Sequence, residues 1–208
     1  MVTSSPATFV VRDATPRDAY AVTVTLAAAF RDSSLARWLD PDERSRSGTI
    51  WRYAAAVVMQ VMESGIIRVV EDTGRVVAVA AWELEGRWPL PTTHGADGHS
   101  ESETRVQGRW KLLDEVAQSR RPLHITHQQL VLLGVHPDQR GQGLSSYLLI
   151  GHHALLHVTG TAAYTVADQY TYLLLQRHGY SPIGPPHVLP GRMPVWAMWR
   201  PPSPADLR

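Results

Sequence analysis

The sequence predicts one mixed α/β domain, and three observations support this prediction. Predicted strands alternate with predicted helices along the chain, and turn signals join some strands directly. The length of 208 residues falls within the size of a single domain. Apolar residues make up 44% of the chain and charged residues 19%, as in an ordinary globular protein. We therefore expect residues 1–208 to form one domain, with a frayed tail from about residue 201.

The N-terminal half is predicted to contain a strand, two helices and a hairpin of two strands. Thr15 and Pro16 form a typical helix start, because threonine caps the first turn and proline fits within it. The run Asp72–Gly74 is a hairpin signal. The predicted elements are the strand Phe9–Val11, the helices Asp18–Phe30 and Asp40–Glu63, and the strands Ile66–Glu71 and Val76–Leu84.

The C-terminal half is predicted to alternate between helices and strands after a loop at Gly86–His99. That loop is rich in proline, glycine, threonine and histidine, and loops of this length are usually functional or mobile. Together with the N-terminal strands, the prediction gives a sheet of about seven strands. The elements are the helix Ser100–Ser119, the strand Gln129–Val135, the helix Leu144–Val158, the strand Ala162–Ala167, the helix Tyr170–His178, and the strands Tyr180–Val188 and Pro194–Trp199.

Composition excludes several classes of function. The chain has no cysteine, and so no thiol nucleophile, thiolate zinc site or iron–sulfur cluster. Its 20 basic and 19 acidic residues leave a net charge of +1, which provides no basic field for nucleic acid. No segment approaches the roughly 20 apolar residues of a membrane span, and no signal peptide is recognisable. His153 and His157 have metal-ligand spacing but no third ligand. We expect a soluble cytoplasmic protein without a metal site.

The most informative segment is a predicted buried strand that runs into a glycine-containing turn and then a helix. Gly141 and Gly143 let the backbone approach a ligand, and Arg140 adds a fixed cation. The helix that follows offers unpaired N–H groups and a partial positive charge at its start. These features predict a phosphate or pyrophosphate site. The alternative is an ordinary tight turn, and neither the P-loop nor the three-glycine dinucleotide motif is present.

This segment resembles a motif of a known superfamily. Arg140-x-x-Gly143-x-Ser145 is similar to the Arg/Gln-x-x-Gly-x-Gly/Ala motif of the GNAT superfamily of acyl-CoA-dependent N-acetyltransferases, and the preceding run from Gly134 to Asp138 matches as well. The resemblance covers nearly the whole chain. Ser145 departs from the motif, although a small hydroxyl fits the position. Within the superfamily, four runs are similar to those of puromycin N-acetyltransferases: Val11–Thr15, Leu26–Phe30, Gly134–Asp138 and Pro194–Arg200.

The resemblance implies a GNAT fold, in which a mixed sheet flanked by helices holds acyl-CoA between two splayed strands. It implies that backbone N–H groups of the glycine turn bind the pyrophosphate of acetyl-CoA. It also implies that backbone groups near Leu133 and Val135 bind the pantetheine arm and the thioester carbonyl, where they stabilise an oxyanion. The implied cofactor-binding residues are Leu133, Gly134, Val135, Arg140, Gly141, Gln142, Gly143, Leu144 and Ser145.

One departure concerns catalysis. Members of the superfamily carry a tyrosine that protonates the leaving thiolate, and Leu175 stands at the matching position. Tyr172 lies one helical turn earlier on the same face, roughly 5 Å away. Tyr172 is therefore the candidate general acid. The alternative is that Tyr172 packs or lines the acceptor pocket and that no side chain protonates the thiolate.

Two residues are candidates for the general base that accepts the amine proton. Glu83 ends a predicted strand beside the long loop, and His127 precedes the central strand. The unperturbed pKa of histidine, near 6.5, suits this role. The alternative for each is an exposed residue at a strand end.

The resemblance therefore implies an acyltransferase that moves acetyl from acetyl-CoA to a primary amine of a small molecule. Attack is expected to be direct, because no cysteine is present to hold an acyl group. The acceptor is expected to be an antibiotic or a natural-product intermediate. One alternative is transfer of a different acyl group. The other is a non-catalytic acyl-CoA-binding module, suggested by Leu175. We expect no nucleic-acid or membrane partner, and a homodimer is left open.

Overall fold

The computed structural model describes residues 9–84 and 101–202, and it describes side chains from residue 104 onward in the second range. The N-terminal elements follow the prediction closely, with one addition. The chain forms β1 (Phe9–Asp13), a 3₁₀ turn at Pro16–Asp18, α1 (Ala19–Phe30), α2 (Ser34–Leu39), α3 (Glu43–Ser64), β2 (Gly65–Asp72) and β3 (Arg75–Glu83). Helix α2 is not among the predicted elements. It forms because Ser33 caps its first turn, accepting a hydrogen bond from the Ala36 N–H at 3.0 Å.

The C-terminal elements also match, except that one predicted strand is divided. The run Tyr180–Val188 forms two short strands, because Pro185 and Pro186 lack the N–H that a strand ladder needs. The elements are α4 (Glu101–Ser119), β4 (His127–Val135), a 3₁₀ turn at Pro137–Gln139, α5 (Leu144–Val158), β5 (Ala162–Ala167), α6 (Gln169–Arg177), β6 (Ser181–Pro182), β7 (His187–Leu189) and β8 (Met193–Arg200).

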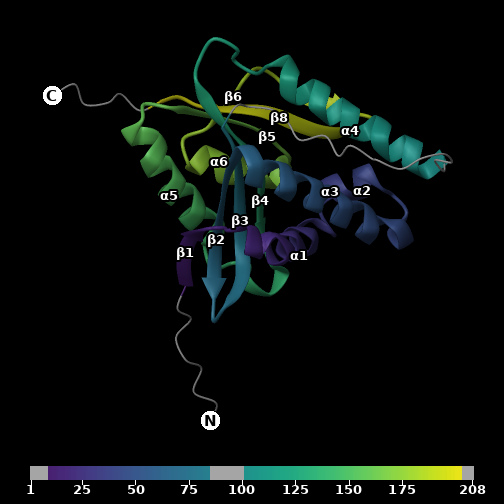
Figure 1. The fold of residues 1–208 in the computed structure, drawn as a ribbon. Helices are drawn as coiled ribbons and strands as arrows, with labels where there is room; N and C mark the ends of the chain where they lie inside the picture. Colours follow the sequence, from purple (N-terminus) through teal and green to yellow (C-terminus); the bar gives the residue numbers. More distant parts are fainter. Residues whose placement is uncertain (1–8, 85–100, 203–208) are drawn as a thin grey trace.

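The described strands form one eight-stranded mixed sheet, which confirms the predicted α/β fold class. Its order is β1-β2-β3-β4-β5-β8-β6, and β7 pairs with β8 beside this path. Strands β4 and β5 are parallel, whereas the other pairs are antiparallel. Figure 1 shows helices on both sides of the sheet. The predicted loop Gly86–His99 lies outside the described residues.

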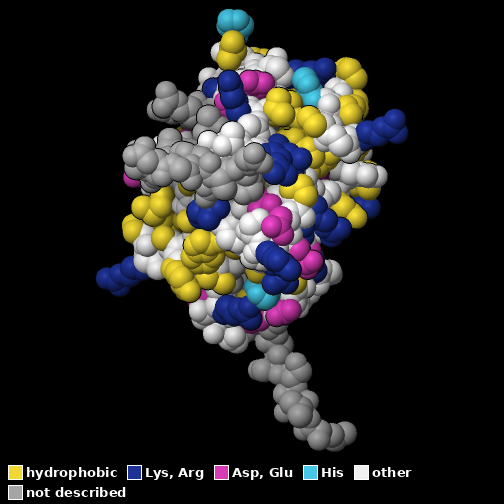
Figure 2. Space-filling view, turned by 90° about the vertical axis from the view of Figure 1, so that its right-hand side faces the viewer, with side chains coloured by type: hydrophobic (Ala, Val, Ile, Leu, Met, Phe, Trp, Pro, Cys, Tyr) yellow, Lys and Arg dark blue, Asp and Glu magenta, His cyan; other side chains and the backbone are white. Residues whose placement is uncertain are grey.

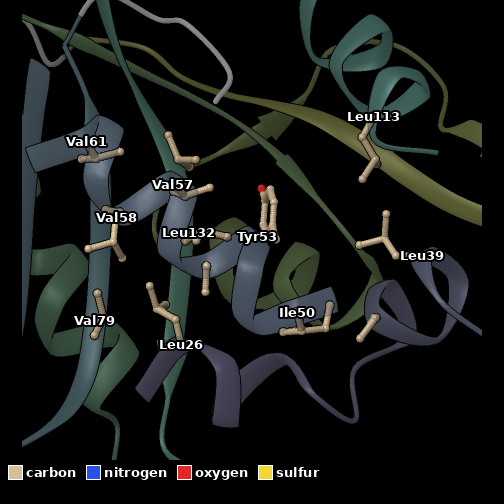
Figure 3. Close-up of a cluster of buried hydrophobic side chains, with 14 of the residues drawn as sticks. Leu26, Leu39, Ile50, Tyr53, Val57, Val58, Val61, Val79, Leu113 and Leu132 are labelled. Carbon is tan, nitrogen blue, oxygen red and sulfur yellow. The ribbon is translucent and has the colours of Figure 1, made fainter. Parts of the chain in front are cut away.

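Two apolar cores hold the helices against the sheet. The first core lies between the sheet and helices α1 to α4, and its stacked rings Tyr53 and Trp110 have centroids 3.7 Å apart. Figure 3 shows Val57 and Val61 of α3 on the side of Val79 and Leu132 of the sheet, whereas Tyr53 lies on the side of α4, where it stacks on Trp110. The second core lies under α5 and α6. Its buried members are Val70, Val77, Ala78, Ala80, Trp82, Leu130, Leu144, Leu148, Leu149, Leu156, Ala163, Ala167, Leu175, Tyr180 and Met198.

The surface agrees with the balanced charge of the sequence. The face shown in Figure 2 carries acidic and basic side chains close together and no broad field of one sign. None of the described helices is both long enough and apolar enough to cross a bilayer.

Candidate functional site

A gap opens in the sheet between β4 and β5. Strand β4 has nine residues and β5 has six, but the two strands pair at only three positions, the last of which joins Gln129 to Tyr164. Beyond this point the Thr165 hydroxyl donates a hydrogen bond to the Leu130 carbonyl at 2.7 Å, so a side chain replaces the backbone ladder. The splayed strand pair that the sequence resemblance implies is therefore present.

An extra residue in β4 accounts for the gap. In the pairing between β3 and β4, Ala81 lies opposite Leu132 and Trp82 lies opposite Leu130, which leaves Val131 without a partner on β3. A bulge of this kind bends its strand and increases the local twist. Because the bulge comes just after the last residue that pairs with β5, it directs the second half of β4 away from β5.

The bulge also leaves backbone groups of β4 facing the gap. The His136 N–H donates to the Val77 carbonyl on β3 at 2.8 Å. Hydrogen bonding alternates along an antiparallel strand, so the N–H groups of Leu132 and Gly134 also face β3. Those of Leu133 and Val135 face the opposite way, into the gap. An extended ligand arm could pair with them as an added strand does.

The glycine turn lies at the open end of this gap. Gly141 and Gly143 have positive φ angles of 80° and 75°, and an added Cβ at either position would meet no atom within 4 Å. Gly143 is the N-cap of α5 and provides no side-chain cap, so the first N–H groups of this 15-residue helix are left for a ligand. Arg140 is anchored beside them, because its Nη2 donates to the Ala29 carbonyl at 2.8 Å.

Other residues of the expected cofactor set have different surroundings. A Cβ at Gly134 would lie 2.9 Å from the Ala29 Cβ, so this glycine allows α1 to approach β4. Leu144 is buried in the second core and offers only its backbone to the turn. Gln142 is exposed, and Ser145 is half-buried in the first turn of α5.

No model of a known protein family matches the sequence, and no curated protein matches it significantly. Solved structures do match. An acetyltransferase from Corynebacterium glutamicum described as histone acetyltransferase HPA2 and related has a TM-score of 0.68 at 21% identity, over 96% of this chain and 99% of that chain. A mosquito arylalkylamine N-acetyltransferase-like protein has a TM-score of 0.68 at 14% identity, over 93% and 100%. PaiA N-acetyltransferase from Thermoplasma acidophilum, in complex with coenzyme A, has a TM-score of 0.56 at 7% identity, over 93% and 99%.

The chain has the GNAT fold. Within this GNAT fold, Glu83 is buried and not exposed at a strand end, with 2% of its surface accessible. Its Oε1 accepts hydrogen bonds from the Ser64 hydroxyl at 2.7 Å and from the Gln60 amide at 3.4 Å. Its Oε2 is buried and has no hydrogen-bond partner among the described residues. Glu83 lies directly opposite Gln129.

His127 lies at the paired end of β4, before the gap begins. It is also buried, and both of its ring nitrogens are engaged: Nδ1 lies 2.7 Å from the Ile125 carbonyl, and Nε2 accepts from Arg121 Nε at 3.3 Å. We assign the proton to Nδ1 because its partner is a carbonyl. Burial lowers the pKa of His127, and the nearby Arg121 charge lowers it further. The structure thus brings Glu83, but not His127, to the point where the gap opens.

Tyr172 packs at the edge of the second core. Its ring lies 4.8 Å from that of Trp196, and its hydroxyl accepts a hydrogen bond from the Gln176 amide at 3.0 Å. Leu175, one turn later, is completely buried in the same core. Tyr172 thus packs against neighbouring side chains, as the alternative expectation states, and its role as general acid stays a prediction.

Two of the α5 histidines, His152 and His153, are buried, whereas His157 is exposed. His153 lies 3.0 Å from the Tyr180 hydroxyl, and burial lowers its pKa to about 3. His152 stacks on Trp82 at 3.9 Å, and burial again lowers its pKa to about 3. The part of the chain that the structure describes contains no group of three or more side chains suited to a metal ion.

Two residues near the gap are absent from the sequence-based set. Gln129 is completely buried, and Thr165 bridges to Leu130. Gln129 carries a usable signal, because a polar amide begins an otherwise apolar strand. Thr165 carries no such signal, since threonine is common in strands.

Proposed function

We propose that this protein is an acetyl-CoA-dependent N-acetyltransferase that acts on a primary amine of a small molecule. The observation that carries the proposal is the alignment of two ligand-binding backbone features: the gap beside β4 leads directly to the uncapped start of α5. An extended arm and a pyrophosphate are the two parts of acetyl-CoA that these features fit. The GNAT fold and a solved neighbour in complex with coenzyme A support the same cofactor.

This arrangement offers partners for three parts of acetyl-CoA. The N–H groups of Leu133 and Val135 would hold the pantetheine arm and the thioester carbonyl. The N–H groups after Gly143, favoured by the positive end of the α5 dipole, would hold the pyrophosphate. Arg140 would add a positive charge beside it.

Acetyl transfer would proceed by direct attack on the thioester. The ammonium of the acceptor gives a proton to Glu83, its nitrogen attacks the carbonyl carbon, the C–N bond forms and the C–S bond breaks. A backbone N–H of β4 stabilises the negative carbonyl oxygen during attack. Glu83 is preferred to His127 as base because it has a free oxygen near the gap, whereas both His127 nitrogens are engaged.

The finer assignments are part of the proposal. We propose that the acceptor is an antibiotic or a natural-product intermediate, on the basis of the similarity to puromycin N-acetyltransferases. Cytoplasmic location, the identity of the acyl group and a homodimer stay predictions. A second candidate function is a non-catalytic acyl-CoA-binding module. It is favoured by Leu175, which is buried where the resemblance places a proton donor.

Release of free thiol from acetyl-CoA tests the proposal. The purified protein is incubated with acetyl-CoA and a panel of primary amines that includes puromycin, with malonyl-CoA and longer acyl-CoAs as alternative donors. Thiol release that depends on both amine and acetyl-CoA supports an N-acetyltransferase. Tight coenzyme A binding without thiol release from any pair identifies the binding module instead.

A further inference from the structure

We propose that Glu83 and Gln129 form a recognition site for a primary ammonium group carried on an apolar body. This site would select the acceptor and hold its nitrogen beside the gap. The inference rests on the proposed function, since it assigns the acceptor class of the same reaction. It adds a residue, Gln129, and a ligand chemistry to that function.

The Glu83 carboxylate is buried without a cation. No described Arg, Lys or His side chain forms an ion pair with it. Its Oε1 has a hydroxyl and a distant amide as partners, and its Oε2 has none. A buried carboxylate is costly unless it is paired with a cation and hydrogen-bonded. The end of α3 at Ser64 adds the partial negative charge of a helix C-terminus, which increases the demand for a cation.

Another buried carboxylate of the same chain shows that full satisfaction is attainable here. Asp40 is also buried, and its Oδ2 accepts hydrogen bonds from Ser45 at 2.7 Å and from Thr49 at 2.8 Å. Its Oδ1 accepts from the Asp42 N–H at 3.2 Å. Asp40 is therefore complete within the protein, whereas Glu83 keeps one oxygen without a partner.

Gln129 provides a second set of unpartnered polar atoms. It is completely buried, and neither Nε2 nor Oε1 has a hydrogen-bond partner among the described residues. Buried amides are nearly always hydrogen-bonded, so this one lacks the partners that such a group normally has. Because Gln129 lies directly opposite Glu83, their Cβ atoms are about 5 Å apart. Glu83 Oε2 lies toward Gly65 on β2, 3.1 Å from where a Cβ of that glycine would stand. An ammonium group would draw the carboxylate toward Gln129, so that it could donate to both Glu83 Oε2 and Gln129 Oε1.

The position of the pair suits delivery of a nucleophile. Gln129 is the last residue of β4 that pairs with β5, so the pair lies where the gap begins. Trp82 points to the α5 side, where it stacks on His152. Successive strand residues point to opposite faces, so Glu83 points to the face covered by α3. An amine held there reaches the gap from the face opposite α5 and α6.

The surroundings define the rest of the ligand. The face that Glu83 shares is lined by the first core, with Val61, Val131 and the Tyr53–Trp110 ring pair among its members. Figure 3 shows the α3 part of this apolar lining. A divalent metal ion would need several oxygen ligands, and the described residues offer no group of three metal-type side chains. A single ammonium on an aromatic or aliphatic body therefore fits best.

The same contacts account for the proton. The ammonium donates to Glu83 Oε2 and transfers one proton to the carboxylate, which leaves a neutral amine with a free electron pair. This nitrogen forms the C–N bond as the C–S bond breaks, and the second proton that it loses on becoming the amide passes through water to the departing thiolate. Glu83 then returns its proton to water. Gln129 would act as a positioning residue, since it orients the nitrogen and takes no proton.

The test compares an amine with its neutral counterpart. Binding of 2-phenylethylamine and of 2-phenylethanol to the full chain is measured by calorimetry with coenzyme A present, so that no acetyl group is available. Hexylamine and hexan-1-ol repeat the comparison on an aliphatic body. We expect the wild type to prefer each amine over its alcohol at least tenfold. Glu83→Gln and Gln129→Leu should remove that preference, and Asp40→Asn should retain it.

The outcomes separate this inference from the proposed function. Equal affinity of amine and alcohol for the wild type in both pairs overturns the ammonium site, as does an unchanged preference in both Glu83→Gln and Gln129→Leu. Coenzyme A affinity, measured on the same samples, reports on the cofactor assignment and on the fold of each variant. If the wild type does not bind coenzyme A, the proposed function is contradicted, regardless of how the amines and alcohols bind.

Discussion

The two ends of β4 have the same strand geometry but different surroundings. At the first end, His127, Gln128 and Gln129 pair with β5, and Gln128 is also tied to α5 through a 2.7 Å contact with His152. At the second end, from Leu130 to Val135, only β3 provides a backbone ladder. One strand therefore serves as a fixed support and as half of a binding site. The change occurs at Val131, the extra residue that has no partner on β3.

Hydrogen exchange should show the largest difference between the two ends. Without ligand, the Leu133 and Val135 amide hydrogens face the gap and should exchange readily, whereas that of Gly134 is paired with β3 and should be protected. Acetyl-CoA should slow exchange at Leu133 and Val135 by about 100-fold and change Gly134 little. Residue-resolved NMR measures all three. Equal slowing at all three amides would mean that the ligand tightens the whole sheet without pairing to the gap.

Catalysis should also distinguish the two ends. Glu83 lies at the gap and His127 at the paired end, so Glu83→Gln should lower kcat about 100-fold at neutral pH. The loss should shrink at high pH, where the amine arrives without its proton. His127→Ala should lower kcat less than about threefold, because its ring nitrogens already have partners. A larger loss in His127→Ala than in Glu83→Gln would assign the base to the paired end.

Most of the fold could be predicted from local patterns. The hairpin at Asp72–Gly74 and the helix after Gly143 form where the turn residues place them. Helix α2 has only six residues, too few for a periodic signal, and depends on the cap at Ser33. The strand predicted over Tyr180–Val188 is divided because two prolines interrupt its ladder.

The candidate site was less accessible to sequence reasoning, because its central feature is a matter of register. The glycine turn is visible in the sequence, but nothing in the run around Val131 shows which residue loses its partner on β3. The burial of Glu83 is likewise a tertiary effect. It depends on the end of α3 lying over the end of β3, where Ser64 donates a hydrogen bond to Glu83. Gln129 could have been noticed as a polar residue in an apolar strand.

The N–H groups at the start of α5, which would bind the pyrophosphate, should be sensitive to an added negative charge. Gly143→Asp places a carboxylate among N–H groups that would bind phosphate, so coenzyme A affinity by calorimetry should fall at least tenfold, about 1.4 kcal/mol. Gly143→Asn adds the same bulk without charge and should cost less. Gly160→Asp is a second control, because Gly160 also has a positive φ of 60° and open space but lies beyond the far end of α5. An unchanged coenzyme A affinity in Gly143→Asp would contradict the assignment of the start of α5 as the pyrophosphate site.

Acid should destabilise the folded protein by protonating His152, which contacts Gln128 at the paired end of β4. Burial lowers the pKa of His152 to about 3, whereas a histidine in the unfolded chain titrates near 6.5. Between these values the unfolded chain binds more protons, so stability is complete above pH 6.5 and is lost as the pH falls toward 3. His152 should contribute up to a tenfold fall in the folding equilibrium constant per pH unit in this window.

Denaturant unfolding at several pH values measures the contribution of His152. His152→Phe keeps a ring to stack on Trp82 and should make the pH dependence shallower. His157→Phe changes an exposed histidine on the same helix and is the matched control. Equal slopes in His152→Phe and the wild type would show that His152 does not titrate as its burial indicates.

The smallest effect is expected at Tyr172, which lies outside both ends of β4. Tyr172→Phe removes a hydroxyl and keeps the ring that packs on Trp196. That hydroxyl already accepts a hydrogen bond from Gln176, and it lies one helical turn from the position where the resemblance places a proton donor. We therefore expect water to protonate the thiolate and kcat to fall less than about threefold. Leu175→Tyr should not restore a donor cheaply, since its hydroxyl would enter a filled core at a cost of about 1–3 kcal/mol. A hundredfold loss of kcat in Tyr172→Phe, with KM unchanged and the circular dichroism spectrum intact, would instead make Tyr172 the general acid.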